Sequence, residues 1–369
     1  VIDTGLDYNH IKFDGKISPI SQSAAGYGGN FYDTGSHGTH VAGIIAAAKD
    51  GGYPMHGVAY NANIAAIRVT NNNGTMYDAS INSAFNIMNR SDIKISNNSY
   101  GVPYSLIDNY DTLSPEIQKM YKDVYRNAYF GSLPAMVDAA VRYDKVLVFS
   151  AGNESFTQPS ISNMLPFFYE GAKDNFIVVV SYNHEQSRTS NSAISDFTNL
   201  CGSASDYCIA APGGNLGAGA GGEGSQVLID STVPGGYGGK AGTSMAAPYV
   251  AGALALVQEA FPGMTGKQMV HSVLSNADKI PGQTYTVDRF ANEMVCTSDY
   301  CYESLVGGTY TRTFEEVFGQ GFLNVGNAVK GPSSFDTTKW GSHYTYNAPL
   351  DTTSHFRYDI SGDAGYLQN

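Results

Sequence analysis

Short apolar runs that alternate with helix-like stretches constrain the fold of this chain more than any other feature. We predict strands at 64–69, 93–97, 146–150, 176–180 and 208–211. We predict helices at 39–48, 79–88, 134–142 and 244–260. Alternation of this kind is typical of a parallel sheet with helices on its faces, so we expect an α/β fold with a mainly parallel twisted sheet. The segment 102–133, rich in Tyr and polar residues, is interpreted as an elaborated loop.

Composition and charge exclude several classes of protein. The chain has 369 residues, of which 42% are hydrophobic and only 15% charged, which favours a large buried core over disorder. Its 21 Lys and Arg against 33 Asp and Glu give a net charge of −12, which argues against a nucleic-acid partner. No apolar run approaches the ~18 residues of a membrane helix, so we expect no membrane contact from this segment.

The four cysteines form two close pairs, Cys201 with Cys208 and Cys296 with Cys301. Both pairs lie in polar segments, and we interpret them as disulfides. A zinc site is the weaker alternative, because neither pair has the CxxC spacing and no His stands nearby. Disulfides in polar loops favour an oxidising compartment outside the cytoplasm.

Two stretches in the first part of the chain carry side chains suited to acid–base chemistry. Asp3, in Asp3-Thr4-Gly5, follows a short apolar run and would lie at the carboxyl end of a strand, where α/β sheets place their sites. An ordinary turn is the competing interpretation. His37 opens the stretch HGTHVAG at the start of a predicted helix. His40 lies one turn further on, but without an HExxH carboxylate the two do not indicate a metal site.

A serine and an asparagine follow in the second part of the chain. Ser244, in GTSMAAP, lies where a Gly-containing loop enters an apolar helix, so backbone N–H groups would point at negative charge that develops beside its hydroxyl. A plain N-cap serine is the alternative. Asn153 follows Ala151-Gly152 at the end of the strand-like run 148–154, where its amide could donate to an oxyanion, although Asn is also common in turns.

Taken together, these stretches resemble the subtilisin-like serine proteases over roughly residues 1–332. That family has Asp, His, oxyanion Asn and Ser in this chain order, matched here by Asp3, His37, Asn153 and Ser244. The resemblance implies a serine endopeptidase in which Ser244 is the nucleophile, His37 the general base and Asp3 its orienting carboxylate. Asn153 and the backbone N–H of Ser244 would form the oxyanion hole. The resemblance implies no cofactor.

The same resemblance implies where a substrate lies. The run Ser99-Tyr100-Gly101 matches the strand that pairs with an extended peptide, with Gly74-Thr75 as a partner on the opposite side. Tyr100, Gly152 and Met164 suggest a preference for apolar or aromatic side chains. The substrates would be proteins or peptides.

For other residues we expect structural roles and no part in the chemistry. We expect His40 to be a hydrogen-bonded structural residue. The run 49–52 lies where some relatives loop around calcium, but its single carboxylate makes a poor calcium site, and no metal is assigned.

A narrower resemblance concerns the end of the chain. The stretch 319–328, the two cysteine pairs and the strand-like run 359–362 are similar to the protease passenger of bacterial autotransporters. We expect a protease domain at 1–332, lacking its N-terminal part, and a β-rich segment at 333–369 that begins a β-solenoid stalk. The protein would then be extracellular or on the bacterial cell surface, with a missing signal peptide and a C-terminal membrane barrel outside this sequence.

One of two rival functions remains. A non-catalytic adhesin or interaction passenger could keep the fold without the activity, although all four catalytic positions are intact. An α/β-hydrolase esterase is rejected because its order is Ser, acid, His with a GxSxG turn, whereas Ser244 comes last and Ala246 stands where the second Gly would be.

Overall fold

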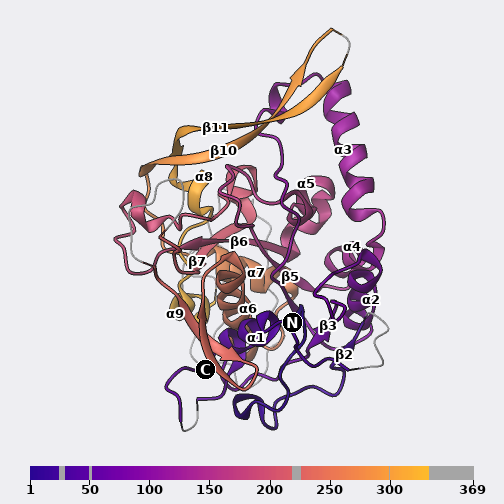
Figure 1. Ribbon diagram of the computed structural model, residues 1–369, viewed down its shortest axis with the longest axis vertical. Coiled ribbons are helices and arrows are strands. Elements are labelled where there is room, and N and C mark those ends of the chain that lie inside the picture. Colours follow the sequence, from indigo (N-terminus) through magenta and orange to yellow (C-terminus); the bar gives the residue numbers. More distant parts are fainter. Residues whose placement is uncertain (25–29, 50–51, 218–225, 299, 332–369) are drawn as a thin grey trace, which may run out of the picture.

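A seven-stranded sheet forms the centre of the computed structural model (Figure 1). The structure describes residues 1–331 except 25–29, 50–51, 218–225 and 299. The strand order is β2-β3-β1-β4-β5-β6-β7, and every pair in the sheet is parallel. Its strands are β1 (Ile2–Asp3), β2 (Gln22–Ser23), β3 (Ile67–Arg68), β4 (Ile95–Asn98), β5 (Val146–Ser150), β6 (Phe176–Tyr182) and β7 (Cys208–Pro212). The predicted α/β class is confirmed.

Helices cover both faces of the sheet, as the sequence pattern predicts. One face packs against α1 (His37–Ala46), α6 (Thr243–Ala260) and α7 (Gly266–Ser275). The other packs against α2 (Asp78–Asn89), α3 (Pro115–Phe130), α4 (Pro134–Val141) and α5 (Leu165–Phe168). The short helices α8 (Phe314–Phe318) and α9 (Val325–Ala328) follow near the end of the described chain.

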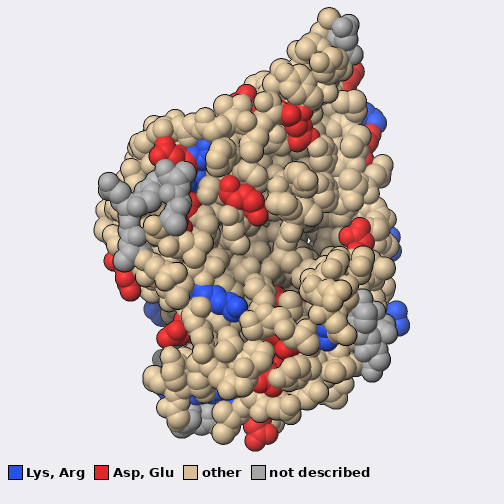
Figure 2. Space-filling model, viewed as in Figure 1, with Lys and Arg blue, Asp and Glu red and all other residues tan. Residues whose placement is uncertain are grey.

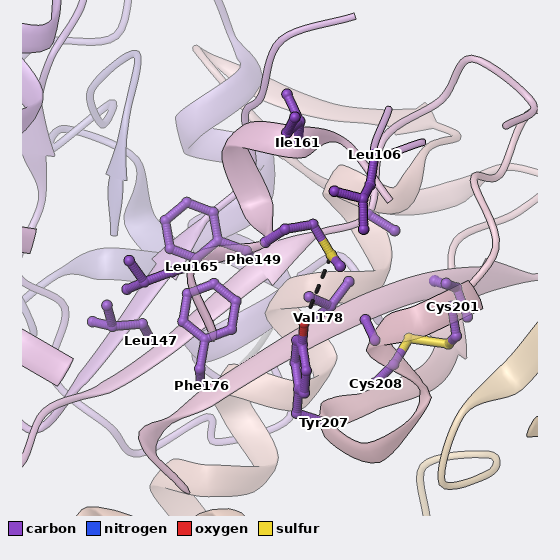
Figure 3. Close-up of a cluster of buried hydrophobic side chains, with 14 of the residues drawn as sticks. Leu106, Leu147, Phe149, Ile161, Leu165, Phe176, Val178, Cys201, Tyr207 and Cys208 are labelled. Atoms are coloured by element: carbon purple, nitrogen blue, oxygen red, sulfur yellow. Dashed lines mark hydrogen bonds between the residues drawn. A yellow bond between two sulfur atoms is a disulfide. The ribbon is translucent and has the colours of Figure 1, made fainter. Parts of the chain in front are cut away.

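The central strands are buried on both faces, which explains their unbroken apolar runs. In β5, Val146 and Val148 face the α6 side, whereas Leu147 and Phe149 face the α2 side. Figure 3 shows the second of these cores, where the rings of Phe149 and Phe176 stack at 5.2 Å. The sheet is therefore fixed from both sides, and the loops at its carboxyl edge start from rigid positions.

Both predicted disulfides are present. Cys201–Cys208 lies in the same buried region as Phe176 (Figure 3), where it closes the turn that leads into β7. Cys296–Cys301 joins the ends of β10 (Thr284–Cys296) and β11 (Cys301–Thr313). The second bridge closes the tip of a hairpin that projects from the body of the molecule (Figure 1).

Two parts of the fold differ from the prediction. The segment 102–133 is not a loop throughout, since 115–130 forms the 16-residue helix α3. Ser114 caps this helix and Pro115 occupies its first turn, both ordinary start signals. Neither the hairpin β10–β11 nor the smaller hairpin of β8 (Ile229–Val233) and β9 (Gly236–Lys240) was predicted from the sequence. The predicted β-rich segment 333–369 lies outside the described residues.

Within the described part of the chain, no helix is long and apolar enough to span a membrane.

Candidate active site

Three of the residues singled out from the sequence lie at the carboxyl edge of three neighbouring strands. Asp3 ends β1, Ser99 follows β4, and Asn153 follows β5 by three residues. The register pairs Ile2 with Asn98 and Asn98 with Phe149. Asp3 and Ser99 are therefore at the same level of the sheet, as expected where parallel strands end together.

Asp3 and His37 form a direct hydrogen bond. The Nδ1 of His37 lies 2.8 Å from Oδ1 of Asp3, which also accepts the backbone N–H of Thr4 at 2.7 Å. Asp3 is only 1% exposed, whereas the side chain of His37 is 31% exposed. The carboxylate thus holds one ring nitrogen from inside the protein, while the imidazole keeps access to the surface.

The surroundings of His37 favour its protonated form. Burial lowers the pKa of His37, but the negative charge of Asp3 and its hydrogen bond raise that pKa by more. Lys240 opposes this increase and Asp33 adds to it, and the net pKa is above the ordinary value of 6.5. A protonated imidazole is therefore stabilised at this position.

Ser244 occupies the first turn of α6. Its Oγ donates to the carbonyl of Ser99 at 3.2 Å, and the hydroxyl of Ser99 donates to the carbonyl of Ser244 at 3.0 Å. Because Ser99 lies at the level of Asp3, this contact brings Ser244 to the same edge of the sheet as the Asp3–His37 pair. The helix N-terminus at Ser244 presents backbone N–H groups and a partial positive charge.

Asn153 is oriented by the residue that precedes Ser244. Its Oδ1 accepts both the backbone N–H and the hydroxyl of Thr243, each at 2.9 Å. With the carbonyl end held, the Nδ2 of the exposed Asn153 side chain points away from Thr243 as a donor. The structure therefore joins the loop after β5 to the start of α6 through one amide.

A buried carboxylate that the sequence analysis did not single out holds this arrangement together. Asp33 is 1% exposed and accepts four hydrogen bonds, from Thr4 Oγ1 (2.8 Å), Gly35 N (2.9 Å), Thr39 N (2.8 Å) and Thr39 Oγ1 (2.6 Å). Thr4 Oγ1 in turn accepts the backbone N–H of Gly38 at 2.8 Å. Asp33 thereby ties the residue after Asp3 to the residue after His37 and caps the start of α1.

We expect Asp33→Asn to lower both stability and activity. Each oxygen of Asp33 accepts two hydrogen bonds, so the NH₂ group of an Asn side chain would face two buried donors. The substitution should reduce the free energy of unfolding by roughly 2–4 kcal/mol. A displaced His37 should lower kcat/KM on the order of 10²-fold. Thermal unfolding and NMR titration of His37 check this, because loss of the charge also lowers the pKa of His37. The exposed control Asp111→Asn should leave the free energy of unfolding, kcat/KM and the pKa of His37 unchanged. If Asp33→Asn also leaves all three unchanged, Asp33 does not have this role.

The remaining predicted residues have varied surroundings. His40 is fully buried with Nε2 3.0 Å from the carbonyls of Ile229 and Gly238, and burial lowers the pKa of His40 to about 4, so it is a neutral structural residue. The hydroxyl of Tyr100 donates to Asn98 Oδ1 at 3.1 Å. Gly74 lies in a tight turn after β3 with φ of +81°.

Two residues predicted to shape a substrate pocket differ in their surroundings. Met164 is fully buried, and its Sδ accepts the hydroxyl of Tyr207 at 3.8 Å, so its part in the side-chain preference stays a prediction. Gly152 has φ of +109°, and a Cβ there would lie 2.4 Å from Asn199 Nδ2, so only Gly fits.

Charged groups are sparse on the face drawn in Figure 2. Lys and Arg are scattered there and form no patch, and the surface is hollowed near its middle. Across the residues that the structure describes, no three His, Cys, Asp or Glu side chains come together as metal ligands.

The chain belongs to the subtilase family, whose model matches residues 1–298. An extracellular serine protease of Serratia marcescens is 27% identical over 91% of this chain, and subtilisin NAT of Bacillus subtilis subsp. natto is 29% identical over 77%. Among solved structures, a cold-adapted subtilisin-like serine proteinase has a TM-score of 0.52 at 25% identity, covering 76% of this chain and 83% of its own. The fold is thus that of a subtilisin-like serine endopeptidase.

A second solved structure supports the fold alone. The epidermin leader peptide processing serine protease of Staphylococcus aureus has a TM-score of 0.61 at 21% identity and covers 90% of this chain and 75% of its own. The chain spans 32% of the Serratia protease and 61% of subtilisin NAT.

Proposed function

We propose that this chain is an extracellular serine endopeptidase that cleaves proteins or peptides through Asp3, His37 and Ser244. The observation that carries the proposal is the 2.8 Å hydrogen bond from His37 to buried Asp3, at the same level of the sheet as Ser244. Family membership and the similarity to extracellular proteases support the same reaction.

The proposed reaction begins when Ser244 Oγ attacks the scissile carbonyl and His37 Nε2 accepts its proton. This requires the Ser244 hydroxyl to rotate from Ser99 toward the imidazole. Asp3 then stabilises the imidazolium that forms. His37 gives the proton to the leaving amine, which leaves an acyl group on Ser244, and a water molecule activated by His37 hydrolyses that ester.

The tetrahedral intermediate carries negative charge on the former carbonyl oxygen. Asn153 Nδ2 and the backbone N–H of Ser244 are suited to donate to it, since the opposite end of the Asn153 amide is held by Thr243. Such fixed donors need no reorganisation as the charge develops.

Attachment to a cell surface stays a prediction.

A serine-directed fluorophosphonate probe tests the proposal. We expect the native protein to be labelled once, with mass spectrometry placing the adduct on Ser244, and we expect the labelled protein to lose casein hydrolysis in proportion to labelling. Heat-unfolded protein is the control, because labelling requires the assembled site. An adduct on another serine, or hydrolysis that survives full labelling, would contradict the assignment.

A further inference from the structure

A buried polar turn fills the space between the ends of β4 and β5. The two strands stop pairing after Asn98 and Phe149, and the 3₁₀ turn η3 (Ile161–Asn163) lies between the segments that continue from them. The Nδ2 of Asn163 donates to the carbonyls of Tyr100 at 2.9 Å and Ser150 at 2.7 Å. One amide therefore bridges the two separated segments.

Ser160 reinforces this bridge one step along the same segments. Its backbone N–H donates to Ala151 O at 2.8 Å, and its hydroxyl donates to Val102 O at 2.5 Å. Both Ser160 and Asn163 are 1% exposed. Carbonyls of both segments thus accept hydrogen bonds from the same turn, and these bonds leave that turn little freedom to move.

The filled space begins immediately at Gly101. A Cβ on Gly101 would lie 2.7 Å from Asn163 Nδ2 and 3.0 Å from Ser160 Oγ. Any side chain that enters between the segments at this level meets the amide and the hydroxyl at once. The recess that the two strand ends could form is therefore shallow, and its floor is polar.

The same two segments flank the position of the reacting acyl group. Ser244 Oγ contacts Ser99 on one segment, and Asn153 follows Gly152 on the other. A carbonyl carbon bonded to Ser244 Oγ, with its oxygen turned to the Asn153 amide, lies between them. The space at Gly101 lies between these same segments, so it is open to the side chain of the residue that contributes this carbonyl.

We propose that Asn163, supported by Ser160, is a specificity-determining residue that restricts this substrate position to small side chains such as Gly, Ala and Ser. This inference rests on the proposed function. A Phe or Tyr side chain would have to displace the Asn163 amide and leave the carbonyls of Tyr100 and Ser150 without their donor. The inference is an alternative to the apolar or aromatic preference suggested by the sequence.

Internally quenched peptides that differ only in the residue before the cleaved bond test the inference. We expect kcat/KM for Ala and Ser to exceed that for Phe and Tyr by about 100-fold. Cleavage with equal or greater kcat/KM for Phe would overturn the inference but leave the proposed function standing. If the wild type cleaves no peptide and is not labelled at Ser244, the proposed function fails and the inference with it.

Asn163→Gly tests the residue itself. Removal of the amide should raise the kcat/KM ratio of Phe to Ala at least tenfold, with fluorophosphonate labelling used to count folded sites. Asn276→Gly is the matched control, because Asn276 is a buried Asn that also donates to two carbonyls, those of Ser272 at 2.8 Å and Gly331 at 2.9 Å. An unchanged ratio in folded Asn163→Gly would overturn the assignment. If that variant does not fold, the wild-type peptide series decides.

Discussion

Ser244→Ala is expected to lower kcat for peptide hydrolysis by about 10⁶-fold while the fold survives. The substitution removes the nucleophile, yet it leaves Asn153, the helix N-terminus and the substrate-binding segments in place. The hydroxyl makes one described contact, to Ser99 O, so its loss should change the free energy of unfolding by only about 1 kcal/mol. Hydrolysis of a quenched peptide and thermal unfolding measure the two effects.

The size of this effect separates the proposed enzyme from a non-catalytic passenger of the same fold. Ser187→Ala, in an exposed loop after β6, is the control and should keep wild-type activity. A wild type that cleaves nothing would favour the interaction protein. Activity that persists undiminished in Ser244→Ala would remove this serine from the reaction.

The fold class alone predicts that groups at the ends of neighbouring strands lie close together. Asp3 ends a strand of the parallel sheet, and Ser99 and Asn153 each follow another strand. Because parallel strands end at a common edge, their proximity follows from the fold class. The hydrogen bond between His37 and Asp3 is seen only in the structure, because it depends on how α1 packs.

Asp33 and Asn163 could not be found in this way. Asp33 acts on Thr4 and Thr39, and Asn163 acts on Tyr100 and Ser150, so their roles exist only after segments from different elements have packed. A single Asp or Asn in a polar loop is otherwise typical of a turn. The residues that position the chemistry are thus less visible in the sequence than those that perform it.

The misassigned segment 115–130 did carry a readable signal. Tyr121, Tyr125 and Tyr129 recur at four-residue spacing, and in α3 neighbouring rings of this series lie 4.4 and 5.8 Å apart. The long strand β10 likewise alternates buried and exposed positions over most of its length. Both were missed because abundant Tyr and polar residues were interpreted as loop composition, and because the partner strand β11 is exposed on both faces.

Asp3 determines which ring nitrogen of His37 carries the proton. We expect Asp3→Asn to lower kcat by about 10⁴-fold, although Asn and Asp side chains have nearly the same size and shape. Asp3 Oδ1 accepts from His37 Nδ1, which keeps the proton on Nδ1 and leaves Nε2 as the base. An Asn amide can donate to Nδ1 instead, which puts the proton on Nε2, so the imidazole can no longer accept a proton from Ser244.

The pH dependence of this variant distinguishes loss of charge from general damage. Because Asp3 raises the pKa of His37, wild-type activity should rise with pH through a value above 6.5, as the neutral imidazole forms. In Asp3→Asn the pKa of His37 falls, so the residual activity should reach its plateau at lower pH. The exposed Asp14→Asn serves as control and should leave both rate and profile unchanged. If Asp3→Asn keeps the wild-type rate, or if its acidic limb moves to higher pH, then Asp3 does not orient and stabilise His37.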